Sequence, residues 1–142
     1  MTNKELKWIL YSSVNADTEL KRLIDMRADE YEKITSITAK LGAAGSGTPD
    51  PHKFDRLVAI DEAISYAIDN RESLRAQECA MFDKLTDVRE CRILYERYMN
   101  YDMKGARPKL QTWESIAEKL AYTRQHVTRL HGQALAHLKE LR

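Results

Sequence analysis

Features that would mark a membrane or secreted protein are absent from this chain of 142 residues. No stretch approaches the roughly 18 consecutive apolar residues that a membrane-spanning helix needs. The segment MTNKELKWILYSSVN at the amino terminus lacks the apolar core and the small-residue cleavage site of a signal peptide. We therefore expect no membrane partner and a cytoplasmic location.

Proline and glycine are also scarce, with three and five copies. All but one of them fall in two short segments, GAAGSGTPDP at residues 42–51 and KGARPK at residues 104–109. These segments mark two breaks in an otherwise helix-rich sequence. The remaining glycine, Gly132, lies inside a predicted helix, where glycine costs roughly 1 kcal/mol relative to Ala. We expect it to allow close packing against another backbone.

Patterns of catalytic or metal-binding residues are missing as well. The two cysteines, Cys79 and Cys91, have no CxxC partner, so we interpret them as reduced thiols at a helix interface. There is no Gly-rich phosphate loop and no HExxH motif. The spacing of His126, His131 and His137 does not bring two imidazoles onto one helical face. We expect no enzyme activity, no metal and no cofactor.

The overall net charge of +1 hides a strong asymmetry. Residues 103–142 hold eight Lys and Arg against three Glu, a net charge of +5, which leaves −4 for the first 102 residues. A basic end on an acidic chain indicates a polyanionic partner, although an ordinary charged surface could have the same composition.

Two long segments with helical periodicity flank the first break. The heptad spacing before it predicts one long helix, or two with a break near residues 12–18, where Ser, Asn and Asp gather. The spacing after it predicts a helix over residues 53–84. Two such helices joined by a flexible loop should form a long antiparallel hairpin, residues 1–84. The stripe positions are Leu6, Leu10, Ser13, Asp17, Leu20, Ile24, Arg27, Tyr31, Ile34, Thr38 and Leu41, then Leu57, Ile60, Ile64, Ala67, Arg71, Leu74, Glu78, Met81 and Leu85.

Charged residues interrupt both stripes at Arg27, Arg71 and Glu78. They could be buried pairs that fix the register, or they could lie at a solvated edge. We favour the edge, because unpaired burial of charge is costly. Several apolar residues also fall outside the seam between the two helices, and they predict a homodimer formed through the hairpin. These residues are Trp8, Ile9, Phe54 and Val58.

The predicted second domain, residues 85–142, opens with a helix that starts at Thr86 or Asp87, both good N-caps, and ends near Asn100. A basic loop without periodicity follows at residues 101–111. Thr112 then caps a short helix that ends near Leu120.

The small and apolar residues after Thr112 have the spacing of a helix-turn-helix. Ala121 occupies the turn position where glycine is usual, and Thr123 is the N-cap of the second helix. The expected inner faces are Ile116, Ala117 and Leu120 on the first helix, and Val127, Leu130, Ala134, Leu135 and Leu138 on the second.

The residues outside that inner face favour DNA recognition. Arg can pair bidentately with guanine and Gln with adenine, and a capped helix N-terminus can bind phosphate. A purely structural helical hairpin would more often carry Glu and Lys there. The predicted DNA-binding residues are Thr112, Lys119, Thr123, Arg124, Gln125, His126, Thr128, Arg129 and His131.

Three segments resemble region four of bacterial sigma factors: Arg97-Tyr98, residues 113–117 (WESIA) and residues 134–138 (ALAHL). The run from Arg124 to Leu135 makes the chain more similar still to phage late transcription regulators of the ArpU and RinA type. This resemblance covers about 55 carboxy-terminal residues, and the loop at 101–111 is longer than the family's usual link. It implies an all-α protein that regulates transcription by binding specific double-stranded DNA in a bacterial host cell.

Two alternatives stay open. A small terminase subunit also joins helices to a DNA-binding module, but it forms rings of many copies, whereas a regulator has one or two. A sigma-like module could instead bind RNA polymerase, and salt-dependent DNA binding would distinguish the two.

Overall fold

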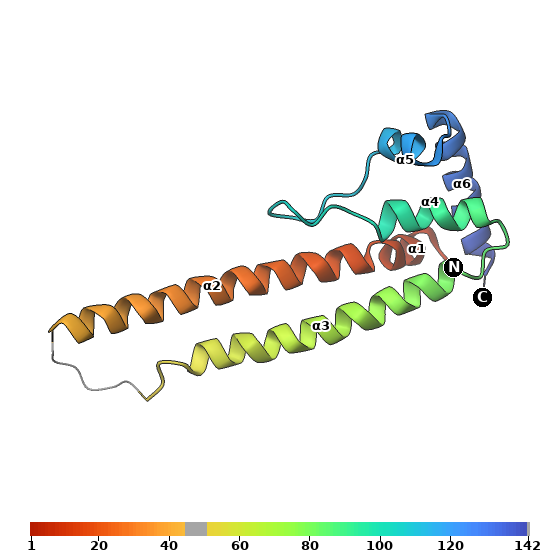
Figure 1. The fold of residues 1–142 in the computed structure, drawn as a ribbon. Helices are drawn as coiled ribbons and strands as arrows, with labels where there is room; N and C mark the ends of the chain where they lie inside the picture. Colours follow the sequence, from red (N-terminus) through yellow and green to blue (C-terminus); the bar gives the residue numbers. More distant parts are fainter. Residues whose placement is uncertain (45–50, 142) are drawn as a thin grey trace. The chain divides into compact units, whose positions relative to one another are not determined.

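The computed structural model describes residues 1–44 and 51–141, with side chains described for 1–36 and 51–141. The stripe positions Thr38 and Leu41 lie outside the described side chains. The described part of the chain is all-α, as predicted, and contains no strand, only an isolated bridge between Asp102 and Lys109 (Figure 1). Its helices are α1 (Asn3–Leu10), α2 (Ser12–Ala44), α3 (Asp55–Phe82), α4 (Val88–Tyr98), α5 (Trp113–Leu120) and α6 (Arg124–Glu140). None of them has the length and apolar content required to cross a lipid bilayer.

The helix boundaries follow local capping chemistry. The predicted break in the first segment exists, but it lies at Tyr11, one residue before the expected segment 12–18, which is helical. The Ser12 hydroxyl donates to the Ile9 carbonyl (2.7 Å), one of the last backbone acceptors of α1. α4 begins after Asp87, whose carboxylate accepts from the Arg89 N–H (2.9 Å), as predicted.

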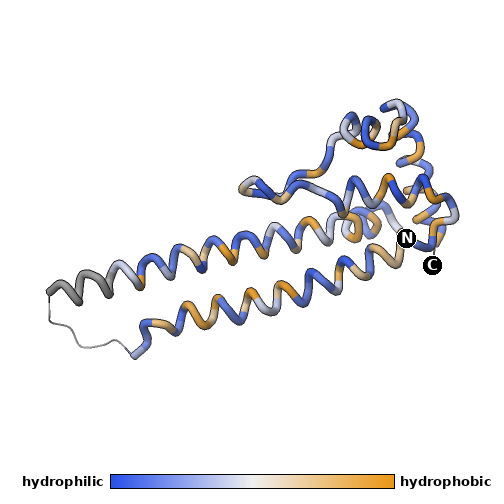
Figure 2. Tube along the Cα trace, viewed as in Figure 1, coloured by the Kyte–Doolittle hydropathy of each residue, from blue (hydrophilic) through white to orange (hydrophobic). Residues whose placement is uncertain are grey.

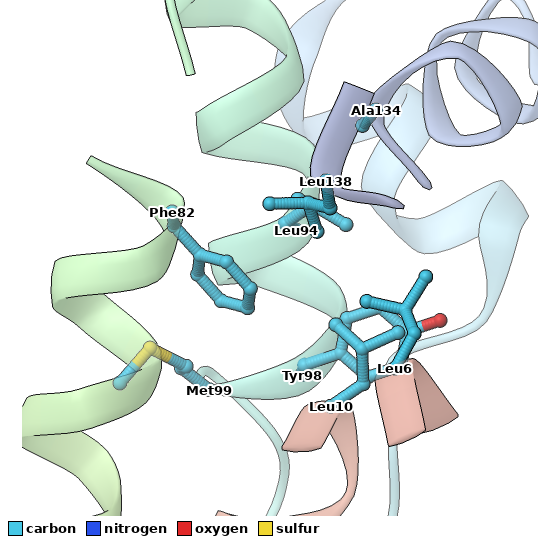
Figure 3. Close-up of a cluster of buried hydrophobic side chains, with 8 residues drawn as sticks. All are labelled: Leu6, Leu10, Phe82, Leu94, Tyr98, Met99, Ala134 and Leu138. Carbon is cyan, nitrogen blue, oxygen red and sulfur yellow. The ribbon is translucent and has the colours of Figure 1, made fainter. Parts of the chain in front are cut away.

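The chain forms two compact units, residues 1–18 with 71–142 and residues 19–70. This grouping differs from the expected division into 1–84 and 85–142, because α1 and the end of α3 pack with the carboxy-terminal helices. Figure 3 shows side chains from α1, α3, α4 and α6 converging on one core. The core residues are Leu6, Leu10, Phe82, Leu94, Tyr98, Met99, Ala134 and Leu138. Cys79 and Cys91 are free thiols, half-buried against this core, as predicted.

The unit of residues 19–70 consists of antiparallel parts of α2 and α3. Ion pairs Arg27–Asp61 (2.5 Å) and Arg56–Glu30 (3.5 Å) join facing positions of the two antiparallel helices. The residues buried between the helices are Leu23, Ile34, Leu57, Ile60 and Ala67.

The predicted stripe on α2 is partly wrong. Leu23 is buried, whereas Ile24 and Tyr31 are 50 % and 53 % exposed. Apolar residues lie on both sides of the line that runs along α2 from Leu20 to Ile34. Only contact with α3 determines which side is buried.

The prediction that the charged stripe residues lie at a solvated edge is confirmed for Arg27 but is wrong for Glu78 and Arg71. Glu78 is fully buried and accepts hydrogen bonds from Ser13 Oγ (2.7 Å) and Ser12 Oγ (3.4 Å). Arg71 pairs with Asp17, which is itself buried. Polar residues on α2 therefore supply the partners that make these charges tolerable inside the fold. Burial raises the pKa of Glu78 to about 7.

Candidate nucleic-acid interface

Both helices of the candidate interface start at the threonines that the sequence predicted. Thr112 Oγ1 accepts from the Ser115 N–H (3.1 Å) at the start of α5. Thr123 Oγ1 accepts from the His126 N–H (3.1 Å) at the start of α6. Each cap satisfies one of the free N–H groups of a helix N-terminus, so the first residue of each helix is well defined.

The turn between α5 and α6 is built around Ala121 in the left-handed conformation, with φ 58° and ψ 40°. The Tyr122 N–H donates to the Ala117 carbonyl (2.9 Å) and the Ala121 N–H to the Glu118 carbonyl (3.3 Å). This pair of bonds is a Schellman motif, in which glycine usually occupies the position of Ala121. The Cβ of Ala121 makes the turn more costly by about 1 to 2 kcal/mol.

A compact apolar core holds α5 and α6 against α4. It consists of Ile93 from α4, Ile116 and Ala117 from α5, and Val127 and Leu130 from α6. The half-buried side chains packed on it are Trp113, Leu120 and Tyr122. The predicted inner faces are therefore confirmed, and the opposite side of the first turns of α6 is left facing outward.

Arg124, Gln125, Thr128 and Arg129 are exposed on that outward side. The exposed Arg124 pairs with Glu114 (3.0 Å), and Arg129 lies 2.8 Å from His126 Nδ1. The Thr128 hydroxyl donates to the backbone carbonyls of Arg124 and Gln125 and is thus engaged within the helix.

Gln125 has no side-chain hydrogen bond within the described residues. It lines a shallow open hollow whose other lining residues are Thr123, His126 and Arg129. The Gln125 side-chain amide therefore lies beside polar and cationic groups at the start of α6.

The prediction that His131 points outward with these residues is wrong. His131 is half-buried, its Nε2 lies 2.8 Å from the Tyr98 hydroxyl, and its ring centroid is 4.6 Å from that of Trp113. Burial, with a contribution from the cation of Arg97, lowers the pKa of His131 to about 4. The flank of α6 that carries His131 faces α4, which the sequence pattern of α6 alone does not reveal. His126 is also half-buried, edge-on to Tyr122 at 4.9 Å.

Lys119 is exposed, but its charge is already paired. Its Nζ lies 3.0 Å from Glu96, whose carboxylate also accepts from Asn100 (2.9 Å) and Gln111 (2.7 Å). Burial by itself would raise the pKa of Glu96, but these three hydrogen bonds outweigh it and hold that pKa below its usual range.

Arg97 connects α4 to the start of α5. Its guanidinium lies over the Trp113 ring, 4.4 Å from the centroid, and donates to the Gln111 carbonyl. Within the described residues, Arg97 Nε is buried without a hydrogen-bond partner. The sequence pattern indicates no role for Glu96, and its only indication for Arg97 is the Arg97-Tyr98 pair.

The loop between α4 and α5 is ordered at both ends. Tyr101 is buried and donates its hydroxyl proton to Asp17, and Gln111 donates to the Asn100 carbonyl (2.8 Å). Asp102 and Lys109 exchange two backbone hydrogen bonds, 2.9 and 2.8 Å. The loop exposes three cations with no ion pair in the part of the chain that the structure describes, Lys104, Arg107 and Lys109.

Gly132 does not pack closely against another backbone, so that expectation is wrong. A Cβ at this position would meet no heavy atom within 4 Å, and the helix continues to Glu140. Nothing in the structure explains the glycine here.

Among the described side chains, residues 1–36 and 51–141, no group of three or more His, Cys, Asp or Glu residues is arranged to hold a metal ion. Comparison of the chain with models of known protein families, with curated proteins and with solved structures finds no significant match.

Proposed function

We propose that this chain is a sequence-specific, DNA-binding transcription regulator of phage or prophage origin, acting in the cytoplasm of a bacterial host. In this proposal α5 and α6 form a sigma region-four-like helix-turn-helix, and α2 with α3 forms an assembly hairpin. The observation that carries the proposal is the exposed start of α6. It presents Arg124, Gln125 and Arg129 beside a fixed turn, on a helix held by its own core.

The chemistry of these side chains suits base recognition in the major groove. The Gln125 amide has no partner within the described residues, and a glutamine can donate to and accept from adenine at once. The Arg124–Glu114 pair is exposed on both sides, 63 % and 60 %, so it is weak and can be exchanged for a contact to guanine. The first turns of the second helix are the part that enters the groove in helix-turn-helix proteins.

The two capped N-termini suit phosphate. Thr112 and Thr123 stand at helix starts, where free N–H groups and the helix dipole favour an anion. Lys119 can add a phosphate contact only by sharing its charge with Glu96. In this proposal His131 does not contact DNA but positions α6, because its ring packs against Tyr98 and Trp113.

The test starts by selecting bound duplexes from random DNA and then measures affinity against salt. We expect each phosphate contact to add about −0.9 to the slope of log affinity against log salt concentration. Gln125→Ala should lose about 1 to 3 kcal/mol on the selected site and relax the preference at one base pair. Lys119→Ala, the matched control, should weaken binding to all sequences about equally.

Affinity that is independent of both sequence and salt would contradict the proposal. Binding of RNA polymerase without DNA would then favour the sigma-like module. DNA binding by a ring of many copies would favour the terminase subunit.

A further inference from the structure

Besides Tyr66, five large apolar side chains are exposed among the described residues of the two-helix unit 19–70. Ile24 and Tyr31 on α2 are 50 % and 53 % exposed. On α3, Val58 and Ile68 are 53 % and 40 % exposed, and Phe54, directly before that helix, is 54 % exposed. Figure 2 shows hydrophobic residues recurring along both helices. Exposure of this much apolar surface on neighbouring helices indicates a surface that is covered in the assembled protein.

One ion pair shows that these residues lie on the same side of the unit. Arg27 stands between Ile24 and Tyr31, three and four residues away, so the three share a face of α2. Asp61 stands seven residues from both Phe54 and Ile68, and three from Val58. Arg27 and Asp61 meet at 2.5 Å, so the two rows adjoin and form one apolar face.

The seam between the two helices leaves this face without cover. Leu23, Ile34, Leu57, Ile60 and Ala67 fill the seam, but two helices in a single layer can bury only the surfaces that they turn toward each other. A second pair of helices completes a four-helix bundle, the usual arrangement in which such surfaces are buried.

We propose that this apolar face is the dimer interface of the protein, and that a second copy of the same two-helix unit covers it. The interface residues are Ile24, Tyr31, Phe54, Val58 and Ile68, with the Arg27–Asp61 pair at its middle.

The charge and the size of the face favour a second copy as the occupant. Arg27 and Asp61 add one charge of each sign, so a two-fold related copy can place its Asp61 near Arg27 and its Arg27 near Asp61. The five half-exposed side chains supply on the order of 500 Å² of surface per copy, which matches the apolar share, somewhat over half, of the about 800 Å² per partner that a standard interface buries.

The dimer does not depend on the proposed DNA binding. If both hold, the dimer brings two reading helices to one site, and the selected DNA should contain two related half-sites.

The experiment measures the mass of the full-length protein by sedimentation equilibrium across the micromolar range. We expect a dimer for the natural protein. Val58→Glu and Ile24→Glu should each weaken the association at least tenfold while helical circular dichroism is kept, because both side chains are exposed in the single chain.

Two control variants remove exposed aromatic rings outside the face. Tyr66 on α3 is 75 % exposed and two residues before Ile68, which places it on another side of the helix, and Trp8 on α1 is 67 % exposed. Tyr66→Glu and Trp8→Ser should leave the dimer intact. A monomeric natural protein, a larger ring, or a dimer that resists Val58→Glu and Ile24→Glu would overturn the proposal, and so would loss of the dimer in either control.

Discussion

Tyr98 and His131 meet between α4 and α6, with the Tyr98 hydroxyl 2.8 Å from His131 Nε2. Burial raises the pKa of Tyr98 to about 12 and lowers that of His131 to about 4. At neutral pH the tyrosine hydroxyl therefore donates to a neutral imidazole. This bond adds a directional contact to the apolar core that packs α6 on α4, and both hold His131 on the inner side of α6.

The protein should lose stability in mild acid through His131. Its pKa falls from an ordinary value of 6.5 to about 4 on folding, so its contribution is present above pH 6.5 and is lost as pH falls toward 4. His131→Gln keeps an acceptor for Tyr98 but does not titrate. Urea unfolding at pH 7 and pH 5 should show a larger acid loss for the natural protein than for the variant. Equal losses in both proteins would argue against a buried, neutral imidazole.

Ala121→Gly should stabilise the fold. The left-handed conformation at φ 58° costs an alanine about 1 to 2 kcal/mol, and glycine adopts it without that cost. The matched control is Ala136→Gly at an exposed position inside α6, where glycine should destabilise by about 1 kcal/mol. Urea unfolding of both variants should give shifts of opposite sign, and a loss of stability in both would refute the strained turn.

The loop cations should contribute to DNA binding without reading sequence. Lys104, Arg107 and Lys109 are exposed, without an ion pair in the described residues, and lie on a loop that is held at both ends. Replacing all three by alanine should weaken binding to every duplex and make the salt slope shallower by about 0.9 for each lost phosphate contact. Lys33→Ala, which removes an exposed cation of the other unit, should change neither. An unchanged slope in the triple variant would show that this loop does not touch phosphate.

Glu78→Gln should stabilise the protein at alkaline pH. The pKa of Glu78 rises from an ordinary 4.5 to about 7 on folding, so its favourable contribution is present below pH 4.5 and is lost as pH rises through 7. A glutamine can still accept from Ser13 but carries no charge to desolvate. The stability of the variant relative to the natural protein should therefore be higher at pH 8 than at pH 5. A difference that is independent of pH would show that Glu78 does not titrate in this range.

The amino-acid sequence by itself determined the elements that depend on neighbouring residues. Asp87, Thr112 and Thr123 cap helices because each side chain needs only an N–H two or three residues away. Ala121 was recognised as the turn residue, and the inner faces of α5 and α6 were recognised by their spacing, for the same local reason.

Only the tertiary structure decided which residues face a partner. Ser13 meets Glu78 across 65 residues of sequence, and Tyr98 meets His131 across 33. The charge of Glu78 assigned it to a solvated edge, and the polarity of His131 assigned it to the outward face of its helix, but these contacts turn both side chains inward. Ile24 shows the opposite change: periodicity placed it in the seam, but packing against α3 leaves it exposed. Periodicity specifies a face of one helix, whereas burial is fixed by the side chains that another helix brings to that face.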